Sequence, residues 1–194
     1  MDYVIEHLKE TMCLHKFRCG VPAMDRFIQD GLNLSIDNHY CKAYIVKDIR
    51  ANNIIALFAL SFDSLDLDID DKTDTMSGLS TTDTPLLTDN YKDVFLNKSR
   101  YPALEIAYLA VSESYGHNKG LGSSIIEAII DRTQQQDFAG CQFVTVETLN
   151  TKEHNAVGFY IKCGLSPCEF PDPNKGTLRM FRTLYPLPLE NDVY

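Results

Sequence analysis

The stretch ESYGHNKGLGSSII, from Glu113 to Ile126, is the most informative part of the chain. It places three glycines, Gly116, Gly120 and Gly122, between an apolar run typical of a strand and a run typical of a helix. Glycines at a strand-to-helix junction form an ordinary turn, or they let backbone N–H groups approach an anion, most often a phosphate. The flanking sequence has to distinguish between these two interpretations.

The flanking segments predict a strand–helix–strand unit. ALEIAYLAV (103–111) and QFVTVETL (142–149) are typical of strands, and GLGSSIIEAIIDRTQQQ (120–136) places apolar residues on one face of a helix. A strand, a helix and a strand at this spacing imply a parallel pair with a right-handed crossover. We expect a further helix at 153–164 and a last strand at 178–186.

The N-terminal half predicts further elements of the same sheet. Apolar residues at helical spacing predict a helix over 21–35, and KAYIVKD (42–48) and IIALFALSF (54–62) are typical of strands joined by a short polar turn. Short connections imply antiparallel pairing. The predicted fold class is therefore α/β (α+β), with a mixed, mostly antiparallel central sheet flanked by helices.

The region from Asp63 to about Lys98 differs in composition. Nine Asp and two Lys between 63 and 93 account for seven of the nine net negative charges. We expect an acidic excursion loop at about 63–98, with a short helix near YKDVFLN, inside a single domain spanning 1–194. The run DLDIDDKTD lacks the glycine and the terminal Glu of a calcium loop, so no metal site is expected.

Composition argues against several classes of protein. Of the 194 residues, 44% are hydrophobic and 23% are charged, which is ordinary for a soluble globular protein. No apolar run approaches the roughly 18 residues of a membrane span, and the first residues lack an apolar signal region. We therefore expect a cytoplasmic location without membrane contact. The six cysteines include no CxxC pair, so reduced and mostly buried thiols are expected.

Two common phosphate-binding motifs do not fit the glycine-rich stretch. A Walker loop needs Lys and then Ser or Thr directly after its last glycine, but here Lys119 precedes Gly120. A Rossmann fingerprint needs a third small residue three positions after its second glycine, and this chain has Ile125 there. A different kind of phosphate loop has to be considered.

The pattern HNKGLG (117–122) resembles the R/Q-x-x-G-x-G/A loop of the GNAT superfamily of acetyl-CoA-dependent N-acetyltransferases, with His117 in place of Gln or Arg. Its neighbours add to the resemblance. LAV (109–111) resembles the strand end that pairs with pantetheine in that family, and NAVGFYIKCGL (155–165) resembles the signature A-x-x-F-Y-x-K-x-G-F. The resemblance covers about residues 40–185 and implies a GNAT-like sheet with a splayed parallel strand pair at its centre.

The N-terminal part narrows the resemblance to a bacterial subgroup. FRCGVPAMDRFI (17–28) resembles the opening F-x-C-G-x-x-x-L-D-x-F-L of that subgroup, and RYPALEIAYLAV (100–111) resembles one of its strands. Well-known members are toxins of toxin–antitoxin pairs that acetylate the amino group of aminoacyl-tRNA. The acidic excursion is longer here than in those toxins, and acid-rich loops repel RNA phosphates.

The resemblance implies that acetyl-CoA is the cosubstrate, and that the loop amides and the following helix N-terminus bind its pyrophosphate. Elementary electrostatics agrees, because successive N–H donors meet the positive end of a helix dipole there. The cofactor-binding residues implied in this way are Leu109, Ala110, Val111, His117, Asn118, Lys119, Gly120, Leu121, Gly122, Ser123 and Asn155.

Two residues are expected to be catalytic. Tyr160 resembles the family tyrosine that protonates the leaving thiolate of coenzyme A. In a regular strand, even spacing places Glu105 on one face with Leu109 and Val111, where its carboxylate would deprotonate the amine of the acceptor. Glu147 is the alternative general base. The structural alternatives are a packed aromatic ring for Tyr160 and a salt-bridged strand residue for Glu105.

The sequence thus predicts an acyltransferase that moves the acetyl group of acetyl-CoA to a primary amine by direct attack. The acceptor class is a small molecule, a peptide or an aminoacyl group. Two alternatives stay open: a toxin-type enzyme acting on aminoacyl-tRNA, which the net charge of −9 does not favour, and a CoA-binding module without chemistry. A homodimer is compatible with the C-terminal strand and tail.

Overall fold

The structure is a computed structural model. It describes residues 2–68, 72–73, 89–116, 119–169, 172 and 174–184, with the backbone alone at 89–92. His117, Asn118 and half of the predicted acidic excursion, namely 69–71 and 74–88, therefore lie outside the described residues. Among the helices that the structure describes, none is long and apolar enough to cross a membrane.

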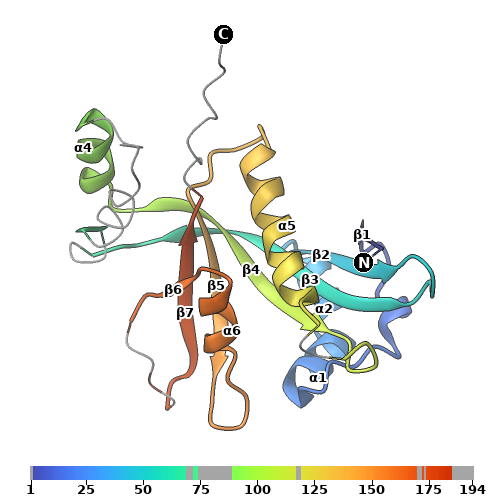
Figure 1. Cartoon of the computed structure of the whole chain (residues 1–194). Helices are drawn as coiled ribbons and strands as arrows, with labels where there is room; N and C mark the ends of the chain where they lie inside the picture. Colours follow the sequence, from blue (N-terminus) through green and yellow to red (C-terminus); the bar gives the residue numbers. More distant parts are fainter. Residues whose placement is uncertain are drawn as a thin grey trace.

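A seven-stranded sheet forms the centre of the molecule (Figure 1). Its order is β1-β2-β3-β4-β5-β7-β6, and every neighbouring pair is antiparallel except β4 with β5. The strands are β1 (Tyr3–His7), β2 (Lys42–Asp48), β3 (Ile54–Leu65), β4 (Tyr101–Val111), β5 (Phe143–Asn150), β6 (Ser166–Pro167) and β7 (Gly176–Thr183). The predicted fold class is confirmed.

Helices cover both faces of this sheet. α5 (Leu121–Gln135) and α6 (Val157–Lys162) pack on one side, here called the α5 face (Figure 1). The 3-10 helix η1 (Thr11–Leu14), α1 (Pro22–Asp30) and α2 (Leu32–Asp37) pack on the opposite side, here called the α1 face. The helix α4 (Asp89–Asn97) covers another part of the α1 face through the buried ring of Phe95.

Strand alternation divides the core between these layers. On β3, Ala56 and Phe58 belong to the cluster under α5, whereas Leu57 and Ala59 belong to the cluster under α1. Further along β3, Leu65 belongs to the cluster under α4. The α1 face thus carries two separate apolar clusters, and the stretch of sheet between them is polar.

Most predicted elements are present, with shifted ends. The predicted helix over 21–35 is two helices, α1 and α2, which meet at Gly31. The predicted strand 54–62 was too short, because β3 continues to Leu65, which pairs with Tyr101 and is buried beside it. The acidic excursion therefore begins after the strand and not at Asp63. The short helix predicted near YKDVFLN is confirmed as part of α4.

The ends of the C-terminal elements also differ from the prediction. The helix expected at 153–164 begins only at Val157, because the preceding residues form a loop closed by a bridge between Asn150 and Asn155. β7 begins at Gly176, two residues before the predicted start. The strands β1 and β6 and the helix η1 were not predicted, since short elements carry little periodic signal.

The parallel strands β4 and β5 separate along their length (Figure 1). Their ladder contains only three residue pairs: Ala103–Phe143, Leu104–Val144 and Glu105–Thr145. β4 nevertheless stays paired with β3 as far as Val111, and β5 stays paired with β7 as far as Asn150. The splayed parallel pair is thus confirmed, and we call it the β4–β5 fork.

A bulge interrupts β4 just beyond the last pair of that ladder. Leu60 of β3 lies opposite Ile106, but the preceding residue, Ala59, lies opposite Tyr108. β4 therefore contains one extra residue, Ala107. Because side chains alternate between the two faces with a period of two, an extra residue reverses the alternation beyond it.

Candidate active site

The glycine-rich stretch leads into the N-terminus of α5, beside the end of β4. Gly120 is the N-cap residue of α5 and has a φ of 78°, a left-handed conformation that favours glycine. A Cβ at Gly120 would meet no atom of the described residues within 4 Å, so the backbone there is open. The N–H groups of Leu121, Gly122 and Ser123 have no carbonyl partner within the helix. An open helix N-terminus of this kind fits an anionic group.

Gly122 has a second structural reason to be glycine. A Cβ at this position would lie 3.0 Å from Cζ of Phe159 and 4.0 Å from Cγ2 of Val111. The missing side chain therefore lets α6 and the end of β4 pack against the first turn of α5. Gly122 acts in helix packing as well as being a predicted pyrophosphate contact.

Lys119 closes the turn before α5. Its Nζ donates a hydrogen bond to the carbonyl of Tyr115 at 2.6 Å and lies 4.9 Å from the centre of the Tyr115 ring. Gly116, between them, has a φ of 90°. The ammonium of Lys119 is thus held beside the turn, while the predicted contacts of His117 and Asn118 lie outside the described residues.

Tyr160 lies on α6 with its ring in the cluster under α5, and only 7% of the residue is exposed. Its ring stands edge-on to that of Phe159, with the centroids 5.0 Å apart. Burial, and then the neighbouring Cys163 thiol, raise the pKa of the Tyr160 phenol well above its usual range. The hydroxyl therefore keeps its proton at neutral pH and remains available as a donor.

Asn155 and Ser123 connect the predicted binding residues to α6. Oδ1 of Asn155 accepts a hydrogen bond from the Val157 N–H at 3.0 Å, and Nδ2 donates to Oδ1 of Asn150 at 3.0 Å. Asn155 thus binds the first N–H of α6, whose N-cap residue is Ala156, and within the described residues its Nδ2 donates only to Asn150. Oγ of Ser123 accepts a hydrogen bond from Sγ of Cys163 at 3.5 Å, which joins α5 to the end of α6.

The expectation that Glu105 shares a face with Leu109 and Val111 was wrong. Leu109 and Val111 pack against the cluster under α5, whereas Glu105 bonds to Ser61 on the α1 face. The bulge at Ala107 is the physical reason, because it reverses the alternation between these residues. The side chain of Glu105 and those of Leu109 and Val111 consequently lie on opposite faces of the sheet.

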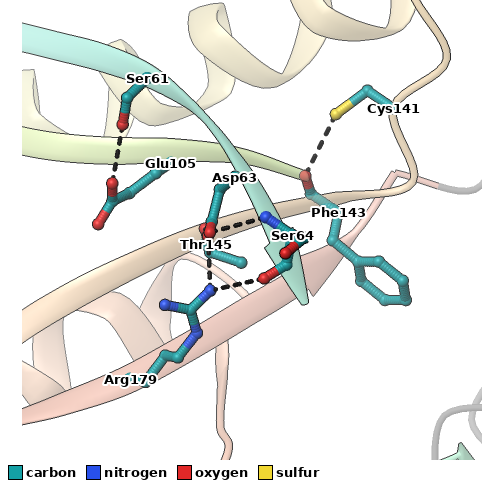
Figure 2. A network of polar contacts seen from close by, with 8 residues as sticks. All are labelled: Ser61, Asp63, Ser64, Glu105, Cys141, Phe143, Thr145 and Arg179. Carbon is teal, nitrogen blue, oxygen red and sulfur yellow. Dashed lines mark hydrogen bonds and ion pairs between the residues drawn. The ribbon is translucent and has the colours of Figure 1, made fainter. Parts of the chain in front are cut away.

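Glu105 belongs to a row of polar side chains on the α1 face, between the two apolar clusters (Figure 2). Oγ of Ser61 donates to Oε2 of Glu105 at 2.8 Å. Asp63 accepts hydrogen bonds from Oγ1 of Thr145 and, at 2.6 Å, from a guanidinium nitrogen of Arg179. We call these five residues the polar strip. It crosses the sheet at the point where β4 and β5 part.

The helix α1 borders the polar strip. The ring of Phe27 stacks on that of Tyr108, with centroids 4.1 Å apart and an interplanar angle of 20°. Burial first, and then the negative charges of Cys41 and Glu105, raise the pKa of Tyr108. The carboxylate of Glu105 thus contributes to the raised pKa of Tyr108, which lies just beyond the bulge.

Glu147, the alternative base, lies on the α1 face two residues beyond Thr145 on β5, opposite Arg179 in the β5–β7 register. It is exposed, whereas Glu105 is half-buried. Within the described residues neither carboxylate forms an ion pair. Both therefore stay candidates for the base.

Cys141 is placed unfavourably for the role of a covalent nucleophile. Sγ of Cys141 donates to the carbonyl of Phe143 at 3.3 Å, and burial raises the pKa of Cys141. A protonated thiol is a weak nucleophile. Cys141 lines an apolar cavity of about 220 Å³ beside the C-terminal half of α5. Phe58 and Phe62 also line this cavity. This cavity lies away from the N-terminus of α5 and from Tyr160.

Comparisons with known proteins agree with this geometry. Residues 86–165 match the model of the acetyltransferase (GNAT) family. AtaT complexed with acetyl-methionyl-tRNAfMet is similar in structure, with a TM-score of 0.63 and 19% identity over 94% of this chain and 95% of that chain. AtaTR bound with AcCoA gives a TM-score of 0.64 and 19% identity, with 94% of each chain covered.

A structure described as a bacterial toxin gives a TM-score of 0.60 and 18% identity over 93% of this chain and 91% of that chain. No curated protein matches the sequence. Fold and family match together define an acyltransferase. The match to the acetyltransferase (GNAT) family covers residues 86–165, and AtaTR, one of the similar structures, is bound with AcCoA, which supports acetyl-CoA as the cosubstrate.

Four members of the polar strip were missed by sequence reasoning: Ser61, Asp63, Thr145 and Arg179. Asp63, Thr145 and Arg179 come from three strands, and the ion pair joins residues 116 positions apart. Asp63 was assigned to the acidic excursion because it is the first of many Asp residues. No local pattern marks such a contact, since it depends on the order of the strands.

Proposed function

We propose that the protein is an N-acetyltransferase that transfers the acetyl group of acetyl-CoA directly to a primary amine. The observation that carries this proposal is the β4–β5 fork, with the open N-terminus of α5 and Tyr160 on one face and Glu105 on the other. A fork with donor groups on one face and a carboxylate on the other suits a reaction in which two substrates meet from opposite sides.

In this proposal each residue has a defined task. The amides of Leu121, Gly122 and Ser123 bind the pyrophosphate, and backbone groups of Leu109 to Val111 bind the pantetheine arm. The ladder with β5 ends at Glu105, so the β5-facing backbone of these later β4 residues is not used by β5. A backbone N–H there would also stabilise the oxyanion.

The proposed proton transfers are balanced by two side chains. Glu105, through water, accepts the proton that the amine loses as its nitrogen forms the bond to the carbonyl carbon. Tyr160 donates its proton to the sulfur as the carbon–sulfur bond breaks. Holding both reactants in the fork removes much of the entropic barrier.

The cofactor site is tested with Gly120→Glu. We expect wild-type protein to bind acetyl-CoA with micromolar affinity, and Gly120→Glu to bind at least about tenfold more weakly, because a carboxylate at the helix N-terminus repels the pyrophosphate and a side chain strains the left-handed backbone. Isothermal titration of acetyl-CoA and of CoA measures this. Gly140→Glu is the control, since Gly140 lies in the loop after α5, away from Gly120. If the wild-type protein showed no detectable binding of acetyl-CoA, the proposed acetyltransferase activity would be refuted.

A second candidate function is acetylation of the amino group of aminoacyl-tRNA. AtaT, whose structure carries acetyl-methionyl-tRNAfMet, covers nearly the whole chain, including the N-terminal helices. Exposed Lys16, Arg18 and Arg26 lie in that N-terminal region, and the carbonyl of Arg18 accepts a hydrogen bond from the Glu113 N–H beyond β4. These cations would contact RNA phosphates beside the fork.

An acceptor screen separates the two candidates. If aminoacyl-tRNA is the acceptor, acetylation of it should exceed that of polyamines and should fall steeply between 50 and 200 mM salt, by about tenfold or more, because phosphate contacts release counterions. Lys16→Ala and Arg26→Ala should lower the rate with tRNA and leave the affinity for acetyl-CoA unchanged. Efficient acetylation of a polyamine with no transfer to tRNA would exclude the second candidate.

A further inference from the structure

A single carboxylate on the α1 face joins side chains of three strands, β3, β5 and β7, across the intervening strand β4. Asp63 belongs to β3, yet its Oδ2 accepts hydrogen bonds from Oγ1 of Thr145 on β5 and from Arg179 on β7 (Figure 2). Arg179 also donates to the carbonyl of Ser64 at 3.2 Å. These contacts pass over β4, which lies between β3 and β5 and contributes no polar group to them.

The crossing depends on a small residue in β4. Ala103 lies opposite Asp63 in the β3–β4 register and opposite Phe143 in the β4–β5 register. A methyl group there leaves room for the carboxylate above the strand. A longer side chain at this position would occupy the path from Asp63 to Thr145.

The three groups are sheltered and well satisfied. Thr145 is fully buried, and the side chains of Asp63 and Arg179 are 18% and 32% exposed. Oδ1 of Asp63 also accepts a hydrogen bond from the Ser64 N–H at 2.7 Å, so both carboxylate oxygens have donors. Charge-assisted hydrogen bonds in a partly dry position hold their geometry better than exposed ion pairs.

The contacts act at the base of the fork. Thr145 is the β5 member of the last pair in the parallel ladder, and its partner is Glu105. Beyond this pair no β4–β5 hydrogen bonds connect the two strands among the described residues. The parallel ladder contributes only three pairs at the base of the fork, so a side-chain tie at the third pair adds a restraint directly at the point where the strands part.

We propose that Asp63, Thr145 and Arg179 form a clamp that fixes the opening of the β4–β5 fork and so positions Glu105 relative to the acyl donor. All three are positioning residues, since none faces the donor side of the sheet. The inference rests on the proposed function for its catalytic consequence. The structural part, a tie that restrains the fork, stands without it.

The test compares two variants that differ by one hydroxyl. Thr145→Val keeps the shape of the side chain and loses the hydrogen bond to Asp63, whereas Thr145→Ser keeps the hydrogen bond. Thr148→Val is the matched control, because Thr148 is equally buried on β5 but its hydroxyl has no partner among the described residues. Asp63→Asn is the second variant, which weakens the tie to Arg179 without removing its acceptor.

We expect Thr145→Val to lower kcat about tenfold or more with the Kd for acetyl-CoA within about twofold of wild type, because a small misplacement of reacting groups costs rate more than binding. Thr145→Ser and Thr148→Val should retain kcat. Hydrogen exchange of the amides of residues 145–150 should be faster in Thr145→Val and Asp63→Asn than in wild type. This exchange readout needs no turnover.

The outcomes separate the two proposals. Wild-type kcat and wild-type exchange in Thr145→Val would overturn the clamp, as would equal losses of kcat in Thr145→Ser and Thr145→Val. If the wild-type protein transfers no acetyl group to any acceptor, the proposed function fails, and the exchange comparison alone decides whether the clamp restrains the fork.

Discussion

Tyr160→Phe is expected to lower kcat by about 10²-fold while leaving the Kd for acetyl-CoA unchanged. General acid catalysis by a positioned side chain contributes typically 10²- to 10⁴-fold, and we take the lower end because water can partly replace the donor. Phenylalanine keeps the ring that packs between α5 and α6, so the core is preserved. The loss would therefore report the hydroxyl.

Single-turnover kinetics and titration of acetyl-CoA measure the two quantities separately. Because the pKa of Tyr160 is raised by burial, the phenol stays protonated as the pH rises through 10, the ordinary tyrosine value. Wild-type kcat should thus show no alkaline decline from Tyr160 between pH 7 and 10.

Tyr101→Phe is the control for Tyr160→Phe. The hydroxyl of buried Tyr101 donates to the carbonyl of Phe95, far from α6 in the cluster under α4. Its loss should lower the free energy of unfolding by about 1–3 kcal/mol and leave kcat unchanged. A Tyr160→Phe variant with wild-type kcat would show that Tyr160 is a packing residue and not the acid.

Glu105→Gln is expected to lower kcat by about 10²-fold, again with unchanged affinity for acetyl-CoA. Glutamine can still accept the hydrogen bond from Ser61, so the side chain should keep its place on β4. What it loses is the capacity to accept a proton. A half-buried carboxylate without an ion pair in the described part of the chain suits that role.

Glu147→Gln decides between the two candidate bases. Glu147 is more exposed and lies beyond the base of the fork, so its replacement should change kcat by less than about threefold. Steady-state rates with a saturating amine acceptor provide the comparison. A large loss in Glu147→Gln with little change in Glu105→Gln would assign the base to Glu147 and leave Glu105 as a structural residue.

The glycine-rich turn, the parallel crossover and the position of Tyr160 could be predicted because local sequence carries them. Gly120 lies where a run typical of a strand ends and a run typical of a helix begins. Tyr160 is identified by its place in the segment NAVGFYIKCGL, which resembles a family signature. Local patterns of this kind can be recognised without knowledge of the tertiary fold.

The surroundings of Glu105 could not be predicted in the same way. Its face depends on Ala107, an ordinary residue that gives no sign of a bulge, and the bulge appears only in the register with β3. Gly122 was explained by phosphate approach alone because the contact with Phe159 requires α5 and α6 to be placed first. The tie between Asp63 and Arg179 requires the order of the strands.

The extra residue in β4 also means that this strand can lose one residue without exchanging its faces. Deleting Ala107 would leave a continuous ladder with β3, because Ile106 and Tyr108 already lie opposite the consecutive residues Leu60 and Ala59. Leu109 and Val111 would keep their face, since side chains in a regular ladder alternate with a period of two. A homologous strand without the bulge should therefore be aligned with a gap at Ala107, and an alignment that closes this gap would superpose residues that face opposite directions.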